Sequence, residues 1–162
     1  MDGEGYIGRL SGILRTDVQQ VISVEMEPII IDDKLLDEVS AQAKGSARLR
    51  MNFNLHKSLD AGAQKMLNAL QPGSIFPIHR HHHTAETYIV LRGAIRVYFY
   101  DDSGSIVSSH LLDPCEGFYG LEIPVGVFHT LEVLDKNTVI FEAKEGPYTP
   151  LSEDDILTIQ NK

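Results

Sequence analysis

The fold of this chain is decided by residues 72–93, which read PGSIFPIHRHHHTAETYIVLRG. One residue separates His79 from His81, and Glu86 follows five positions after His81. Side chains alternate between the two faces of a β-strand, so the two histidines point from one face, roughly 7 Å apart along the chain. After a tight connection, Glu86 opens a second strand and returns a carboxylate to the same place. The spacing therefore predicts that these side chains share one cation.

A fourth ligand is expected from the later segment 123–129, which reads IPVGVFH. Its Pro-Val-Gly sequence is typical of a turn leading into another strand, which would carry His129. Histidine is the commonest protein ligand of metals. We therefore predict a metal site made of His79, His81, Glu86 and His129 inside a β-barrel. Three neutral imidazoles and one carboxylate leave a divalent ion one net positive charge and, in octahedral coordination, two open positions.

Other interpretations of the histidine run stay open. A purification tag is disfavoured because the run lies in mid-sequence and is interrupted by Arg80. A solvated histidine patch is the main alternative, whereas a structural zinc site usually includes cysteine and the chain has only Cys115. His83 shares the strand parity of His81 and is its rival as a ligand. Arg80 and His82 have the opposite parity and should point away.

The spacing of these residues resembles the first conserved motif of the cupin superfamily. The matching pattern is Gly73, five residues, His79-x-His81, four residues, Glu86, six residues and Gly93. The second cupin motif is matched by Pro124-x-Gly126-x-x-His129.

The chain departs from the second cupin motif in two places. Gly117 stands one residue further from Pro124 than in the family pattern, and Val133 replaces the usual asparagine. That asparagine is not a metal ligand in the family, so the predicted metal site is unchanged. Any role of the asparagine is in doubt for this chain.

Over roughly residues 30–150, the chain resembles the WbuC-type cupin-fold metalloproteins of bacterial O-antigen gene clusters. The resemblance rests on Asn54–His56, Leu67–Gly73, Glu122–Pro124, His129–Thr130 and Lys144–Tyr148. It implies a connection with O-antigen biosynthesis but no stated reaction. Nitrogen-rich ligation suits a divalent transition metal such as iron, manganese, nickel, cobalt or zinc, and the ligand set alone does not choose among them.

The fold expected from the remaining pattern is mainly β, with a short N-terminal helical segment. Asp32 or Asp33 is suited to cap a helix through Lys34–Lys44, and Gly45 is suited to end it. Residues 64–70 are helical by propensity, but closing a barrel requires a strand there, and we favour the strand. Further strands are expected at 87–92, 94–100, 106–112, 117–123, 128–134 and 138–144. About eight strands of this kind form a double-stranded β-helix, the cupin jelly-roll barrel.

Four segments are predicted along the chain. They are an N-terminal extension at 1–30, a helical segment packing on the barrel at 31–62, the cupin barrel at 63–150 and a C-terminal tail at 151–162. Residues 1–30 combine helical and strand-like spacing of apolar residues. We expect this extension to pack on a partner subunit or to close the open end of the barrel.

Composition limits the classes of partner. The 162 residues include 43% hydrophobic residues but no apolar run near the length of a membrane span. The net charge of −9 disfavours nucleic acid and anionic membranes, while a small anionic ligand stays compatible because a bound cation dominates the local charge. The single cysteine and the lack of a secretory pattern favour the cytoplasm. Cupins commonly pair, so we expect a homodimer.

Candidate pocket residues follow from parity and from the resemblance. Tyr88 lies two residues after Glu86 on the same predicted strand, so its side chain should also point into the barrel. Tyr98 is a candidate for an inward-pointing pocket residue on the next strand. His56 and Asn54 belong to the resemblance and could edge the pocket, although surface positions are equally compatible.

The function that this sequence favours is a small metalloenzyme acting on a sugar, nucleotide-sugar or small acid. A metal-dependent isomerase, lyase or dioxygenase of the cupin type would fit, but no general-base pair, phosphate loop or nucleophile motif identifies the reaction. One alternative is a metal-dependent small-molecule binding or sensing module without turnover. The other is a barrel whose metal is structural or vestigial.

Overall fold

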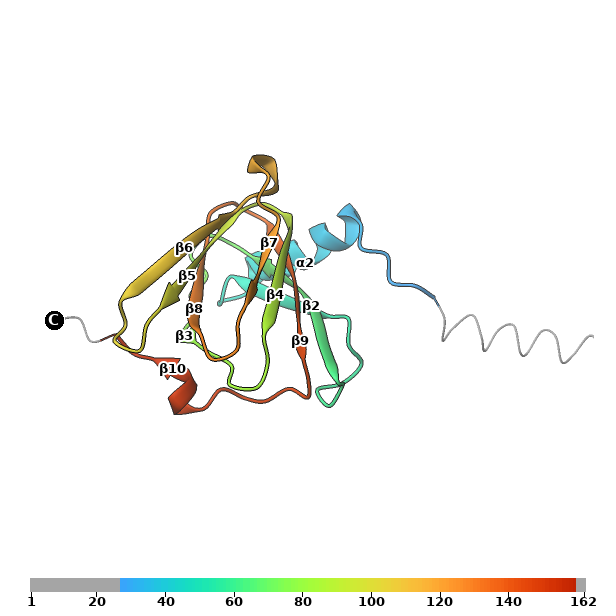
Figure 1. Cartoon of the computed structure of the whole chain (residues 1–162). Coiled ribbons are helices and arrows are strands. Elements are labelled where there is room, and N and C mark those ends of the chain that lie inside the picture. The colour runs from blue at the N-terminus through green and yellow to red at the C-terminus, as the bar shows by residue number, and fades with distance from the viewer. Residues whose placement is uncertain (1–26, 160–162) are drawn as a thin grey trace, which may run out of the picture. The chain divides into compact units, whose positions relative to one another are not determined.

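The computed structural model describes residues 27–159, in which two five-stranded antiparallel sheets form a jelly roll (Figure 1). One sheet contains, in spatial order, β1 (Arg50–Asn54), β2 (Ala63–Leu70), β9 (Thr138–Glu145), β4 (Glu86–Arg92) and β7 (Gly120–Ile123). The other contains β10 (Ile156–Leu157), β3 (Ile78–His79), β8 (Phe128–Val133), β5 (Ile95–Tyr100) and β6 (Ile106–Leu112). The mainly β jelly-roll prediction is confirmed.

The core between the two sheets consists of inward-pointing apolar side chains. Along β5, for example, Ile95, Val97 and Phe99 are buried, while the residues between them are only half-buried. This alternation is the strand period of two. Tyr88 and Val90 of β4 contribute to the same core, as parity predicts.

Helix α2 (Asp33–Gly45) covers the outer face of the first sheet. Its N-terminus is capped by Asp32, whose carboxylate accepts a hydrogen bond from the Leu35 amide at 3.0 Å. The helix buries Val39 and Ala43 against a cluster that includes Leu67 of β2. The predicted helix is therefore confirmed.

The cover that α2 provides explains the ambiguous sequence of β2. Met66, Asn68 and Leu70 are buried on one face of this strand, while Leu67 and Ala69 are buried on the other. A strand buried on both faces does not show the polar alternation that usually identifies a strand. The strand expected at 64–70 is confirmed as β2.

Several boundaries differ from the prediction. The strand expected at 117–123 begins only at Gly120, because the 3₁₀ helix η1 (Pro114–Glu116) ends at Gly117 in the left-handed conformation. β1 and β10 join the sheets, although they lie in segments expected outside the barrel. β10 follows the 3₁₀ helix η2 (Glu153–Asp155) and pairs with β3.

The predicted extension at residues 1–30 lies outside the described residues except for 27–30, which form no regular element. Within residues 27–159, no helix is both long and apolar enough to span a bilayer.

Candidate metal centre

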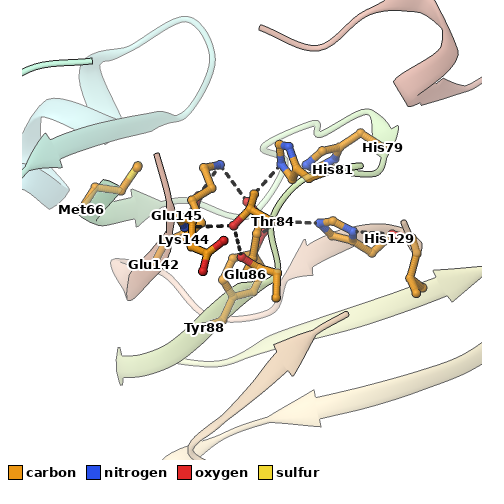
Figure 2. A network of polar contacts seen from close by, with 12 residues as sticks. Met66, His79, His81, Thr84, Glu86, Tyr88, His129, Glu142, Lys144 and Glu145 are labelled. Atoms are coloured by element: carbon orange, nitrogen blue, oxygen red, sulfur yellow. Dashed lines mark hydrogen bonds and ion pairs between the residues drawn. The ribbon is translucent and has the colours of Figure 1, made fainter. Parts of the chain in front are cut away.

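The four predicted ligands converge between the two sheets (Figure 2). Glu86 is the first residue of β4 in one sheet, whereas His79 of β3 and His129 of β8 are paired neighbours in the other. His81 lies two residues beyond the end of β3, so it is not on the strand that the spacing predicted. The backbone carbonyl of His81 accepts a hydrogen bond from the Gly126 amide at 2.8 Å, which ties this loop to the turn before β8.

The distances among the donor atoms suit one shared ion. His79, His81 and Glu86 each offer a ligand atom within 4.8 Å of the others. The Nε2 atoms of His81 and His129 lie 3.1 Å from Oε1 and 3.0 Å from Oε2 of Glu86, respectively. Atoms bound at about 2.1 Å on adjacent octahedral positions of one ion lie about 3 Å apart. The group of His79, His81 and Glu86 therefore needs little adjustment to bind a cation. His129 contacts Glu86 but does not lie within 4.8 Å of all three, so it would have to move toward them to act as the fourth ligand.

Two imidazole nitrogens of the four proposed ligands have no hydrogen-bond partner in the part of the chain that the structure describes, and Nε2 of His56 at the cavity wall has none there either. Nε2 of His81 and Nε2 of His129 are buried and make no aligned hydrogen bond with any residue in 27–159, although both are close to the carboxylate. Buried polar atoms are nearly always satisfied, so two orphans side by side indicate a missing partner. A metal ion would supply that partner, and the residues present fit one.

The opposite ring nitrogens indicate which tautomer the histidines adopt. Nδ1 of His79 lies 3.2 Å from the Pro77 carbonyl oxygen, and Nδ1 of His129 lies 3.0 Å from that of Val127. A carbonyl oxygen only accepts, so each Nδ1 donates, which leaves Nε2 with a free lone pair. Backbone partners of this kind orient metal-ligating histidines.

The electrostatics favour the metal-binding protonation states. Burial is the main cause that lowers the pKa of His79 to about 4, and the charge of His129 adds to it. At neutral pH the His79 imidazole is therefore neutral. Burial alone would raise the pKa of Glu86, but hydrogen bonds from His129 and His81 when their Nε2 atoms are protonated, together with the charge of Lys144, outweigh it and hold that pKa far below its usual value. The carboxylate is ionised.

A charged network that was not predicted surrounds the Glu86 carboxylate. Strand register places Lys144 opposite Glu86, and Glu142 opposite Tyr88. Nζ of Lys144 lies 2.7 Å from Oε1 of Glu86 and 2.9 Å from Oε1 of Glu142 (Figure 2). The Asn68 side-chain amide donates to the other oxygen of Glu142.

The pKa values of Lys144 and Glu142 in this network are both raised, for different reasons. Burial lowers the pKa of Lys144, but the charges of Glu142 and Glu86 outweigh it and raise that pKa above the usual value. Burial and the charge of Glu86 raise the pKa of Glu142. The sequence held a signal for both residues, because two charged side chains alternate with apolar ones in the predicted strand 138–144.

A cavity of about 350 Å³ adjoins the donors and is lined by His79, His81 and Glu86. Tyr88, His56 and Asn54 line it too, as proposed for pocket residues.

Tyr98 does not line this cavity, and its expected inward position is corrected. It lies between the inward residues Val97 and Phe99 of β5 and therefore points outward, where its hydroxyl donates to Glu132 at 2.7 Å. The other histidines of the run also lie outside the cluster. His83 is exposed, and Nε2 of His82 lies 3.3 Å from the Asp155 carboxylate.

Comparison with known proteins places this site in context. A family model described as "Domain of unknown function (DUF6016)" matches residues 31–112. The mannose-1-phosphate guanylyltransferase ManC of Salmonella typhimurium is 25% identical over an alignment of 174 positions, which spans 97% of this chain and 34% of that protein. A mannose-1-phosphate guanylyltransferase of Escherichia coli is 26% identical, again over 97% of this chain and 34% of that protein. The chain thus spans about a third of the length of the curated relatives it matches.

Solved structures share the fold. The capsular polysaccharide assembling protein CapF of Staphylococcus aureus has a TM-score of 0.55 and 19% identity, over 88% of this chain and 39% of that chain. A protein of Bacillus halodurans has a TM-score of 0.50 and 15% identity, over 76% of this chain and 85% of that chain. The predicted cupin fold is confirmed.

Proposed function

The chain belongs to the family described as "Domain of unknown function (DUF6016)", and we propose that it is a metal-dependent cupin acting on a small molecule. One observation supports this proposal most strongly. Nε2 of His81 and Nε2 of His129 are buried without a hydrogen-bond partner beside the ionised carboxylate of Glu86, and Glu86 lines a cavity. His79, His81, Glu86 and His129 would hold a divalent iron, manganese, nickel, cobalt or zinc ion. In octahedral coordination, four protein ligands leave two positions open for a guest.

Turnover is favoured over binding alone by the groups beside the centre. When bound, the ion would polarise a carbonyl or carboxylate oxygen or lower the pKa of a bound water. Glu142 lines the same cavity, and burial raises its pKa above the usual value, which places a carboxyl group suited to proton exchange beside the proposed centre. Tyr88 lies against Glu86, with its hydroxyl 3.4 Å from Oε2, and helps to hold the carboxylate.

The substrate class that we propose is a sugar, nucleotide-sugar or small acid used in making a surface polysaccharide. The support is threefold: the resemblance to WbuC-type proteins, the relatives named for mannose-1-phosphate guanylyl transfer, and the fold shared with a capsular polysaccharide assembling protein. The second candidate function is a binding or sensing module without turnover. Incubating the metal-loaded protein with sugar phosphates, nucleotide-sugars and small acids, followed by mass spectrometry, separates the two.

Removing the metal is expected to lower the melting temperature. A metal that binds only the folded chain stabilises it by about 2.7 kcal/mol at 100 times its dissociation constant, which is a shift of roughly 5–10 °C for a domain of this size. The measurement is a thermal melt before and after chelation, with metal content checked by elemental analysis. An unchanged melting temperature after verified removal would contradict the proposal, and restored metal should restore the melting temperature.

A homodimer is also part of the proposal. β6 and β7 are edge strands, and Ile106 and Val107 on β6 and Phe118 and Tyr119 before β7 are exposed. Exposed apolar residues at a sheet edge favour association with a second chain. Light scattering should give twice the chain mass at micromolar concentration, and a monomer there would refute the dimer.

A further inference from the structure

We propose that Arg48 and Arg50 form an oxyanion-binding subsite in the metal-centre cavity, so that the guest carries a phosphate or carboxylate group. This inference rests on the proposed function and narrows its substrate class. Both arginines line the cavity that His79, His81 and Glu86 also line. A ligand small enough for about 350 Å³ can therefore contact both the donor cluster and the arginines.

The charges around the cavity leave the two arginines available. Lys144 is already shared between two lining carboxylates, Glu86 and Glu142. Neither Arg48 nor Arg50 forms an ion pair with an acid anywhere in the described part of the chain, whereas Arg80 and Arg92 do. In a chain of net charge −9, unpaired positive charge gathered in one cavity attracts anions to it.

The guanidinium of Arg50 is held in place with donors to spare. It stacks over the Phe76 ring, 4.3 Å from the ring centroid, and Nη1 donates to the Ile75 carbonyl oxygen at 3.1 Å. Its Nε and Nη2 make no hydrogen bond to any residue in 27–159, so they can form the paired donors that suit a carboxylate or phosphate. Phe76 and His79 both line the cavity, so the ring that supports Arg50 and a proposed metal ligand border the same space.

The backbone between the two arginines is fixed in an uncommon conformation. Leu49 has a φ of 56°, in the left-handed region that bulky side chains seldom adopt. Its amide donates to the Ser46 carbonyl oxygen at 2.9 Å, and its own carbonyl oxygen accepts from the Gln71 amide at 2.9 Å and the Ser74 hydroxyl at 2.7 Å. Strain that is held by several bonds is typical of preorganised binding sites. The two flanking side chains thus start from a defined backbone.

The test measures anion binding by titration calorimetry with inorganic phosphate and, separately, malonate at constant ionic strength. Each titration uses metal-free and metal-loaded protein. In metal-free protein, Arg48→Gln/Arg50→Gln is expected to weaken anion binding about ten-fold or more, because charge-assisted hydrogen bonds are lost. Lys65→Gln/Arg96→Gln is the matched control, since it also removes two positive charges, from β2 and β5, and neither residue lines the cavity. Its anion affinity should match wild type.

The outcomes separate this subsite from the proposed function. Phosphate binding alone assigns a phosphate group, and malonate binding alone assigns a carboxylate. The subsite is overturned if neither anion binds, or if the cavity and control variants behave alike while melting as wild type does. Elemental analysis of the same samples reports the metal independently. Arginine-dependent anion binding in a protein that takes up no metal would keep the subsite and reject the metal-dependent function.

Discussion

His81→Ala is expected to weaken metal binding by on the order of 100-fold or more. Loss of a second-shell partner alone typically costs 10–100-fold in metal affinity, and His81 is placed as a direct ligand. Its Nε2 is buried, unpartnered and 3.1 Å from Oε1 of Glu86. The measurement is metal content by elemental analysis after dialysis against a weak chelator, where wild type should retain about one ion per chain.

The run of histidines supplies matched controls for that experiment. His82→Ala and His83→Ala remove the same side chain from neighbouring positions outside the donor cluster. Both variants should retain metal as wild type does. A His81→Ala protein with full metal content would exclude His81 as a ligand, and loss of metal in His83→Ala would give the role to its rival.

Lys144→Met is expected to lower the free energy of unfolding of the metal-free protein by about 3–5 kcal/mol. Removing one partner of a buried ion pair leaves an uncompensated buried charge, which is the source of a cost of this size. Here one ammonium, with its side chain only 14% exposed, serves both Glu86 and Glu142, whose side chains are 2% and 10% exposed. The measurement is urea-induced unfolding at neutral pH, where both carboxylates are charged in the unfolded chain.

Lys65→Met is the control for this substitution. Lys65 is an exposed residue of β2 and forms no ion pair among the described residues, so its replacement should change the stability by less than about 0.5 kcal/mol. Saturating metal should reduce the cost of Lys144→Met, because a cation bound at Glu86 replaces part of the lost positive charge. A cost below about 1 kcal/mol without metal would show that the carboxylates do not depend on Lys144.

The proposed ligands could be predicted because their spacing is local and regular. His79, His81 and Glu86 lie within eight residues, and a short strand, a loop and a second strand bring them back together. The strict strand geometry assumed for His81 was not needed, since the loop after β3 turns its side chain to the same point. His129 was a candidate because a turn leads into its strand, and the motif resemblance supported it. Nothing local predicts that β8 pairs with β3.

The remaining parts of the site depend on contacts that parity alone does not define. Tyr98 was misplaced because the inward parity of β4 was carried into the next strand, and the left-handed turn at Gly93 changes the phase. Lys144 and Glu142 meet Glu86 only through the register of β9 against β4. The segment of β2 forms a strand despite its helical propensity, because helix α2 packs on and buries the outer face of that strand.

The central claim is that one divalent ion is held by His79, His81, Glu86 and His129. Anomalous scattering from crystals of the metal-loaded protein tests it most directly. A single strong peak is expected within bonding distance of Nε2 of the three histidines and of the Glu86 carboxylate, with room left for a guest. The central claim would be contradicted if crystals of the metal-loaded protein showed no peak at this position, or if the Glu86 carboxylate were paired with Lys144 alone.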